Sequence, residues 1–318
     1  MSTEMDFESP ADNSDARRDL FAKIARLYYV EDMNQRQIAE QLNISVASVS
    51  RALSKAKDLN IVRISIDESR EEFHKMEIGL ERRYPIRECM VAGRYDSADQ
   101  VHRDMGSMVT GLLARLLKRD NVLGLGWGSD LLGLAKNLGR ASVGRIDIVP
   151  LSGTVTNADP SISGEQIAHA FASRLDGDVH AVPSHAIAES SAARKSIMSD
   201  PSFPPIRRLW NRLDTVIVNL ESVDGREAGT YSSDQKKELK RAGAVCTING
   251  TPIDAEGNEI ENPFGDRLVA VELEEIRHVR NVVAVASGEK SVDPVRAALA
   301  AGFVHVLVID AKCGDGLL

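Results

Sequence analysis

Apolar residues between positions 34 and 53 recur every three or four residues, which is the spacing of two short amphipathic helices. These apolar positions are Ile38, Ala39 and Leu42 on the first helix and Val46, Val49 and Leu53 on the second. Asn34 and Ser45 precede the helices, and each can accept a hydrogen bond from a backbone N–H of the first turn. Only Asn43 and Ile44 remain for the connection, and asparagine tolerates the left-handed conformation of a tight corner. The pattern predicts a helix-turn-helix.

The face opposite these apolar positions on the second helix is short and polar, as in helices that enter the major groove of DNA. The residues predicted to read base edges are Ser45, Ala47, Ser48 and Arg51, and those predicted to contact the backbone are Gln35, Arg36 and Lys55. An arginine in this position can form two hydrogen bonds with guanine. The alternative is an ordinary helical hairpin with a solvated polar face.

The charge of this segment favours contact with nucleic acid. Residues 17–63 contain nine Lys or Arg against five Asp or Glu, whereas the whole chain of 318 residues has a net charge of −8. A basic segment on an acidic protein suits affinity for DNA phosphates. Double-stranded operator DNA is therefore the predicted partner.

The segments around this motif complete a small N-terminal domain. Residues 1–16 are acidic and without periodicity, which predicts a disordered tail. The predicted DNA-binding domain spans residues 17–67. It includes a first helix over 17–29 and a strand over 61–66, which would make the domain winged-helix-like.

The remaining chain divides into a connector and a larger domain. Residues 68–85 are predicted to be a helical linker, with a charged helix that ends before Pro85. Residues 86–318 are predicted to be an effector domain. In this domain apolar, β-branched runs alternate with helical patterns, which predicts an α/β fold with a mostly parallel, Rossmann-like sheet.

The predicted strands of the larger domain are residues 122–126, 146–151, 179–182, 215–220, 244–248, 268–271, 282–286 and 304–309. The predicted helices are residues 104–117, 130–138, 167–174, 233–241 and 292–301. Ligands of such sheets bind at the carboxyl ends of the strands.

Cysteine usage and hydropathy restrict the class of protein. Cys89, Cys246 and Cys313 lie far apart without metal-ligand spacing, so we expect buried thiols and neither a metal nor another cofactor. No apolar run approaches the roughly 20 residues that cross a bilayer, and the N-terminus is acidic. We expect a cytoplasmic protein with no membrane partner.

Three predicted strand ends carry polar loops. Gly126, Gly128 and Ser129 form a bend into a helix, which is either an anion site or simply a tight turn, and Asp130 would repel a phosphate there. A second loop contains Ser152, Gly153 and Thr154, which could bind sugar hydroxyls. A third places Lys290 beyond a strand, where it is either a phosphate ligand or a solvated surface lysine.

Several segments together suggest a family. They are Gln37-Ile38-Ala39, residues 45–53, Gly124-Leu125-Gly126-Trp127-Gly128-Ser129, Pro150-Leu151-Ser152-Gly153, Asp254-Ala255-Glu256-Gly257, Gly288-Glu289-Lys290 and residues 297–302. From about Arg17 to the C-terminus the chain resembles the SorC family of bacterial transcriptional regulators, also grouped with DeoR-type sugar-responsive repressors. The resemblance implies a DNA-binding domain joined to an effector domain similar to sugar-phosphate isomerases and deaminases, commonly in a homotetramer.

The resemblance also implies positions for an effector site. The matching residues are Gly126, Gly128, Ser129, Ser152, Gly153 and Thr154, with Lys290 matching the phosphate-contacting lysine of the family. The chain departs from the usual pattern at Asp130, where the family has threonine, and at Asn219-Leu220-Glu221, where it has Gly-Ile-Gly. Cys246-Thr247-Ile248 replaces Gly-Asp-Ile. With Asp130 and Glu221 in the site, one hypothesis is an effector that is an unphosphorylated sugar or polyol.

The sequence thus predicts a transcriptional regulator whose operator affinity is controlled by a sugar, sugar phosphate or polyol, and which forms a dimer or tetramer. One alternative is an isomerase- or deaminase-like enzyme that carries a DNA-binding domain, with Asp130, Glu221, His180 or His185 as the general base. None of these lies in a recognisable catalytic pattern, so we predict no enzyme activity. A protein-binding scaffold is a third possibility, but it would leave the basic recognition face unexplained.

Overall fold

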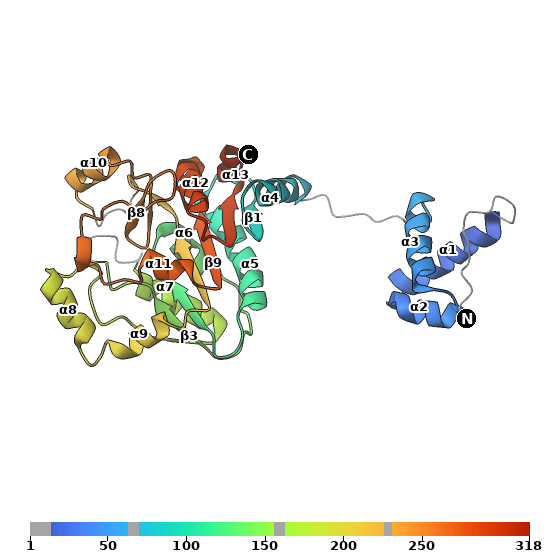
Figure 1. The fold of residues 1–318 in the computed structure, drawn as a ribbon, viewed down its shortest axis with the longest axis horizontal. Coiled ribbons are helices and arrows are strands. Elements are labelled where there is room, and N and C mark those ends of the chain that lie inside the picture. The colour runs from blue at the N-terminus through green and yellow to red at the C-terminus, as the bar shows by residue number, and fades with distance from the viewer. Residues whose placement is uncertain (1–13, 63–69, 156–162, 226–230) are drawn as a thin grey trace. The chain divides into compact units, whose positions relative to one another are not determined.

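The computed structural model describes residues 14–62, 70–155, 163–225 and 231–318 (Figure 1). The chain forms two compact units, divided between Glu68 and Ser69. We call them the N-terminal unit and the larger unit and describe each by itself.

Three helices make up the N-terminal unit: α1 (Ser14–Tyr29), α2 (Gln35–Leu42) and α3 (Val46–Asp58). Their apolar faces bury a common core of Phe21, Ile24, Ala25, Ile38, Ala39, Ile44, Val49, Ala52, Leu53 and Ala56. The helical pattern at positions 34–53 is therefore confirmed as a helix-turn-helix. Leu20 and Leu27 of α1 are only half-buried, at the margin of this core.

The predicted caps fix the ends of α2 and α3. The Asn34 side chain accepts hydrogen bonds from the N–H groups of Arg36 and Gln37, and the Gln37 side chain accepts one from the Asn34 N–H. Asn43 adopts the left-handed conformation with φ of 54°. Ser45 Oγ accepts a hydrogen bond from the Ser48 N–H at 3.1 Å. These local bonds satisfy backbone groups that a short helix leaves exposed at its ends.

The described residues include only part of the predicted tail over 1–16 and of the predicted strand over 61–66. Of the expected disordered tail over 1–16, residues 1–13 lie outside the described residues, and α1 begins at Ser14. Of the strand expected over 61–66, Ile61 and Val62 form a bend in which both backbone N–H groups donate to the Ala56 carbonyl, at 2.9 and 3.0 Å. Residues 63–66 lie outside the described residues.

The helix expected in the linker is α4 (Glu71–Arg83). It belongs to the larger unit, because Met76 and Leu80 are buried in the core of that unit. In the structure this part of the predicted 68–85 connector is therefore a packed helix of the larger unit.

The larger unit is built on a sheet of seven parallel strands in the order β1-β10-β9-β5-β2-β3-β4. Their bounds are β1 Glu88–Ala92, β2 Val122–Leu125, β3 Ile146–Pro150, β4 Gly177–Val179, β5 Thr215–Asn219, β9 Asn281–Ala286 and β10 Val306–Asp310. The strands at the centre are buried on both faces. On β9, for example, Val282 and Ala284 face one core while Val283 and Val285 face the other.

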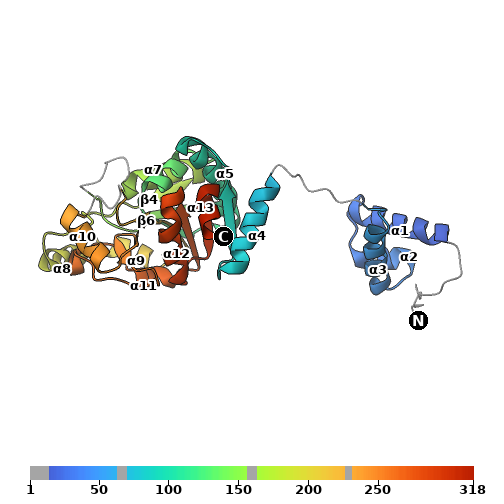
Figure 2. The same ribbon diagram turned by 90° about the horizontal axis from the view of Figure 1, so that it is seen from above.

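Helices cover both faces of this sheet, which confirms the predicted α/β architecture (Figures 1 and 2). One face carries α5 (Ala98–Leu116), α6 (Ser129–Lys136) and α7 (Gly164–Leu175). The other carries α4, α9 (Pro204–Trp210), α11 (Leu273–Arg277), α12 (Val292–Ala300) and α13 (Ala311–Leu317). The short helix α8 (Ser191–Ser199) and α10 (Ser233–Arg241) extend this unit beyond the sheet.

Some strand predictions were wrong in detail. The run at 244–248 forms β7 (Cys246–Ile248), which pairs with β6 (Glu221–Ser222) and β8 (Thr251–Ile253) in a small antiparallel sheet and not in the main one. Residues 268–271, all described, make isolated bridges to Ser152 and Ile187 in place of a strand. β4 ends at Val179, where the predicted strand over 179–182 begins. The periodicity showed apolar positions correctly but not the partners that define a strand.

The edge strand β1 is covered by side chains of the neighbouring helix. Glu81 Oε1 accepts a hydrogen bond from the Cys89 N–H and Glu77 Oε1 accepts one from the Val91 N–H, each at 2.9 Å. Arg70 Nη2 donates to the Val91 carbonyl at 2.7 Å. Burial raises the pKa of Glu77. These bonds occupy groups that an unprotected edge would offer to another strand.

The three cysteines are buried thiols, as predicted. Burial raises the pKa of each of them, that of Cys313 to about 12, so the reactive thiolate is suppressed at neutral pH. Among the described residues, no helix combines the length and the apolar character needed to cross a membrane.

Candidate functional site

Helix α3 presents an exposed polar face on the N-terminal unit. Ala47, Arg51 and Lys55 are exposed on it, as predicted, and Ser45 is half-buried at the helix start. Ser50 and Ser54 are also exposed and one turn apart, with Ser54 Oγ donating to the Ser50 carbonyl at 3.3 Å. Ser50 was expected to face outward, and the spacing of Ser54 from Ala47 and Arg51 is the signal that could have placed Ser54 on the same face.

One predicted contact on this helix is wrong. Ser48, expected to face outward, is fully buried, and Val46, expected to face inward, is 43% exposed. The inner face of α3 is formed by Val49, Ala52, Leu53 and Ala56. Around the helix, the middle of this face lies closer to Ser48 than to Val46. Ser48 Oγ lies 2.9 Å from Ser45 Oγ, so its hydroxyl is satisfied within the protein.

Arg51 is positioned by this buried serine. Its Nη2 lies 3.4 Å from Ser48 Oγ, a long hydrogen bond that leans the guanidinium towards the N-terminal end of α3. Lys55 lies one turn further and pairs with Asp58 at 3.7 Å, with both side chains more than 60% exposed. Such an exposed pair contributes little to stability, so Lys55 can exchange its partner for a phosphate.

Two of the residues predicted to contact the DNA backbone lie at the start of α2. Arg36 is exposed there, whereas Gln35 is half-buried. The predicted DNA-binding residues other than Ser48 therefore all reach the surface of this unit.

The larger unit has a pocket of about 630 Å³ at the carboxyl ends of its central strands. We call it the strand-end pocket. It is lined by Ser129, Asp130, Asn219, Leu220, Glu221, Ser222, Asp224, Gly225, Ser287, Lys290 and Ser291. Four predicted effector-site residues, Ser129, Asp130, Glu221 and Lys290, are brought together here from α6, β6 and the segment after β9.

Asp130 is held rigidly at the start of α6. Its Oδ1 accepts a hydrogen bond from Ser287 Oγ at 2.6 Å and lies 2.9 Å from His102 Nε2. The side chains of His102 and Asp130 are only 13% and 14% exposed. A carboxylate with two partners in a largely buried position keeps its orientation, so the pocket has a fixed acidic group on this wall.

The glycines of the predicted bend serve mainly to make a close turn. Gly126 N–H donates to the Ile217 carbonyl at 2.9 Å, and a Cβ on Gly126 would approach that oxygen to 3.3 Å. Gly128 has a φ of 149°, which favours glycine, and immediately precedes α6. Neither glycine lines the strand-end pocket. Of the two interpretations of this bend, the close strand-helix turn accounts for Gly126.

The second predicted loop does not join the strand-end pocket. Ser152 is buried and donates to the Gly153 carbonyl at 3.1 Å, and a Cβ on Gly153 would lie 2.6 Å from backbone atoms of His185 and Ser184. Thr154 lines a different hollow together with His185. These residues therefore shape the backbone beside the main sheet.

The candidate catalytic bases are also separated. Asp130 and Glu221 line the strand-end pocket, whereas His180 Nε2 lies 2.7 Å from Asp147 Oδ1 and His185 lies beside Thr154. Among the described residues, no group of three or more His, Cys, Asp or Glu is arranged to hold a metal ion.

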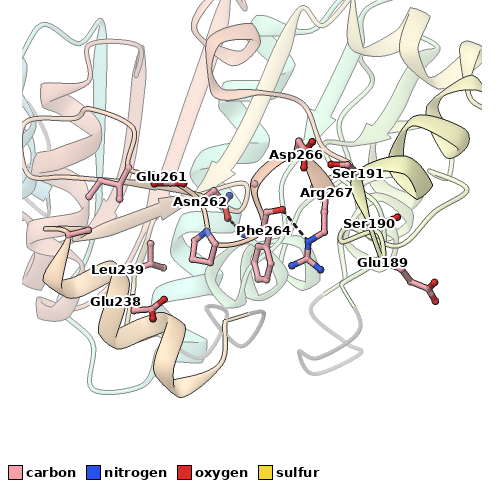
Figure 3. Close-up of a pocket in the computed structure, with 14 residues that line it drawn as sticks. Glu189, Ser190, Ser191, Glu238, Leu239, Glu261, Asn262, Phe264, Asp266 and Arg267 are labelled. Atoms are coloured by element: carbon pink, nitrogen blue, oxygen red, sulfur yellow. Dashed lines mark hydrogen bonds between the residues drawn. The ribbon is translucent and has the colours of Figure 1, made fainter.

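A larger hollow of about 740 Å³ lies between α8, α10 and the segment 260–267 (Figure 3). Figure 3 shows Phe264 and Arg267 side by side, and Arg267 Nε donates to the Phe264 carbonyl at 3.3 Å. Four acidic residues line this hollow: Glu189, Glu238, Glu261 and Asp266. None of the predicted effector residues lies here, and sequence patterns gave no indication of it.

The packing of His102 gives a test of the strand-end pocket. A Cβ on Gly133 in α6 would lie 2.1 Å from His102 Nδ1, so the ring or the helix must shift in Gly133→Ala. We expect a loss of about 1 to 3 kcal/mol in unfolding free energy, measured by urea denaturation. Gly111→Ala is the control, because nothing lies within 4 Å of its added Cβ, and it should leave stability unchanged or raise it by up to about 1 kcal/mol. Equal stabilities for the two variants would contradict the tight packing of this ring.

Comparison with known proteins identifies the family. Residues 68–318 match the family described as "Putative sugar-binding domain", which is well over half of the chain. The chain belongs to the SorC family of sugar-responsive transcriptional regulators. In this SorC-family chain, residues 26–59 also match region 4 of sigma-70 factors, in agreement with the helix-turn-helix.

Similar proteins cover almost the whole SorC-family chain. The sorbitol operon regulator of Klebsiella pneumoniae is 26% identical over 314 residues, which is 96% of this chain and 99% of the relative. The deoxyribonucleoside regulator of Bacillus subtilis is 26% identical over 308 residues, 95% of this chain and 98% of the relative. The crystal structure of full-length SorC from Klebsiella pneumoniae matches with a TM-score of 0.72 and 25% identity, over 94% of this chain and 98% of that one. This SorC-family chain is accordingly a DNA-binding transcriptional regulator and not an enzyme.

Proposed function

We propose that this regulator binds operator DNA through the exposed face of α3 and that its affinity for the operator is controlled by a carbohydrate in the strand-end pocket. Arg51, Ala47 and Ser45 would contact base edges. Arg36, Gln35 and Lys55 would contact phosphates. The observation that carries the proposal is the convergence of Ser129, Asp130, Glu221 and Lys290 on one pocket, in a chain that also has a capped helix-turn-helix.

The chemistry of the pocket supports a polyhydroxylated ligand. Its lining combines carboxylates, hydroxyls, an amide and one ammonium group, all at the carboxyl ends of parallel strands where ligands of such sheets bind. Such groups pair with the many hydroxyls of a sugar, sugar phosphate or polyol. Ser152, Gly153 and Thr154 would act through the backbone beside the sheet and not by contact in this pocket.

A homo-oligomer, either a dimer or a tetramer in the cytoplasm, would make this control effective. Two copies of α3 reach successive major grooves only when their separation fits one helical turn of DNA, about 34 Å, or a multiple of it. A carbohydrate that binds one arrangement of the subunits more tightly than another shifts the population towards that arrangement. Its influence on DNA affinity cannot exceed this difference in binding free energy.

DNase footprinting on the upstream region of the gene, with the full-length protein, tests the proposal. We expect a protected palindromic site whose protection changes when a sugar, polyol or sugar phosphate from a panel is added. Protection that is uniform along the DNA would contradict specific recognition. A specific footprint that no carbohydrate alters would contradict the control.

A further inference from the structure

Two backbone N–H groups next to the strand-end pocket, which could otherwise bind a phosphate group, are already bound to acceptors of the protein itself. Leu131 N–H in the first turn of α6 donates to Asn219 Oδ1 at 3.2 Å. Gly288 N–H after β9 donates to Asp310 Oδ1 at 2.8 Å. An anion that entered would have to compete with these internal bonds.

The hydroxyl groups of Ser287 and Ser291, after β9, also donate hydrogen bonds to acceptors within the protein. Ser287 Oγ donates to Asp130 Oδ1 at 2.6 Å, and Ser291 Oγ donates to the Ser287 carbonyl at 2.7 Å. These two residues line the pocket but direct their protons into the protein. Their oxygen lone pairs remain to accept hydrogen bonds from a ligand.

The charges of the described lining residues also disfavour an anion in this pocket. Asp130, Glu221 and Asp224 are acidic, and Lys290, which is exposed, is the only basic residue among them. Two lysines of α10 lie next to the lining: Lys240 forms an ion pair with Asp224, and Lys236 Nζ donates to the Gly225 carbonyl at 3.1 Å. They balance charge near Asp224, whereas the partners of Asp130 are His102 and Ser287.

Asp130 occupies the position where a helix start would otherwise favour an anion. The partial positive charge of a helix N-terminus attracts phosphate, but a carboxylate in its first turn takes that role and repels a second anion. Since Asp130 is largely buried and fixed by two partners, it cannot rotate away to make room.

We propose that Asp130 determines the class of effector, so that the strand-end pocket selects an uncharged sugar or polyol and discriminates against its phosphate ester. The proposal rests on the function proposed above and specifies the ligand of the same site. Hydroxyl groups of the carbohydrate donate hydrogen bonds to carboxylate and serine oxygens of the pocket. Lys290 contributes a donor to a neutral hydroxyl.

The test compares matched ligands on the full-length protein without DNA. Calorimetry with sorbitol and sorbitol 6-phosphate, glucose and glucose 6-phosphate, and deoxyribose and deoxyribose 5-phosphate gives an affinity ratio for each pair. We expect at least one neutral compound to bind about tenfold or more tightly than its ester, the ratio that corresponds to 1.4 kcal/mol. An ester that binds tenfold more tightly than its neutral form overturns the proposal.

Asp130→Asn tests the assigned residue, because it retains the shape of the side chain and removes the charge. The ratio of neutral to ester affinity should fall by about tenfold or more, as expected for loss of a charged hydrogen-bond acceptor and of its repulsion. Asp234→Asn is the matched control and should alter the ratio by less than about twofold, because Asp234 also lies in the first turn of a helix but is 86% exposed, is paired with Lys237 and does not line the strand-end pocket. An unchanged ratio in Asp130→Asn overturns the proposal.

Inorganic phosphate gives an answer even if none of these carbohydrates is the natural effector. We expect phosphate to leave the melting temperature of the wild-type protein unchanged and to raise that of Asp130→Asn, since a ligand stabilises only the state that binds it. Stabilisation of the wild type that disappears in Lys290→Gln would establish a phosphate site and overturn the proposal. A lack of stabilisation in both the wild type and Asp130→Asn also contradicts it, because removal of the charge should open the site to the anion. These readouts do not involve DNA, so they can fail while operator binding succeeds, and the reverse.

Discussion

Replacing Arg51 with alanine is expected to weaken operator binding by about 1 to 3 kcal/mol and to relax the preference for one base pair in each half-site. The reason is geometric. The guanidinium lies on the exposed face of α3, directed by the buried Ser48, where it can form two hydrogen bonds with a guanine. Titration of the footprinted operator and of single-base variants, by fluorescence anisotropy at one salt concentration, measures both effects.

Arg82→Ala is the matched control for this variant. Arg82 is an exposed residue of α4 in the larger unit, so the substitution removes the same charge without touching the helix-turn-helix. Its operator affinity should remain close to that of the wild type. If Arg51→Ala binds DNA as well as Arg82→Ala does, α3 does not read the operator through this residue.

Truncating Ile38 to alanine is expected to unfold the N-terminal unit. Ile38 is fully buried between the three helices, and removing such a side chain costs about 2 to 5 kcal/mol. A domain of roughly 50 residues has only a few kcal/mol of stability, so this loss is comparable to the whole. Operator binding should disappear, while carbohydrate binding by the larger unit should persist.

Calorimetric unfolding together with the operator titration measures this result. The transition of the N-terminal unit should move to a lower temperature or vanish, and that of the larger unit should stay in place. Val30→Ala is the control, because Val30 is 68% exposed in the same unit and its truncation should have little effect. A stable Ile38→Ala protein that binds its operator normally would show that this core does not maintain the recognition helix.

Local chemistry explains why the helix-turn-helix could be predicted from the sequence so closely. Asn34, Asn43 and Ser45 act within a few residues of their own positions, so their roles depend only on the adjacent chain. The continuous apolar runs of β5 and β9 are similarly direct evidence of strands buried on both faces. Ser48 was misplaced because its hydroxyl is satisfied by Ser45, which makes a polar residue compatible with a buried position.

The strand-end pocket could be predicted only in part, because its geometry depends on distant contacts. The partners of Asp130 lie 28 residues before it, at His102, and 157 residues after it, at Ser287. No local pattern connects these positions. The resemblance to a family pointed to Lys290, which lines this pocket, but the loop of Ser152 was assigned to the same site although it packs against residues near His185.

The helix α9 and the small antiparallel sheet were not predicted, because they too depend on distant contacts. The helix α9 begins with two prolines and has seven residues, too few for a clear periodic pattern. The small antiparallel sheet is made of strands of two or three residues, which become strands only through their pairing. Such elements are defined by tertiary contacts and not by composition.

The most direct test of the central claim is the mutual effect of DNA and carbohydrate on each other's binding. The affinity of the full-length protein for its footprinted operator should change by about fivefold or more when the carbohydrate that binds the strand-end pocket is added at saturation. The affinity for the carbohydrate should change by the same factor when the operator is saturating, because coupling between two sites is reciprocal. Equal operator affinities with and without a carbohydrate that calorimetry shows to be bound would contradict the account.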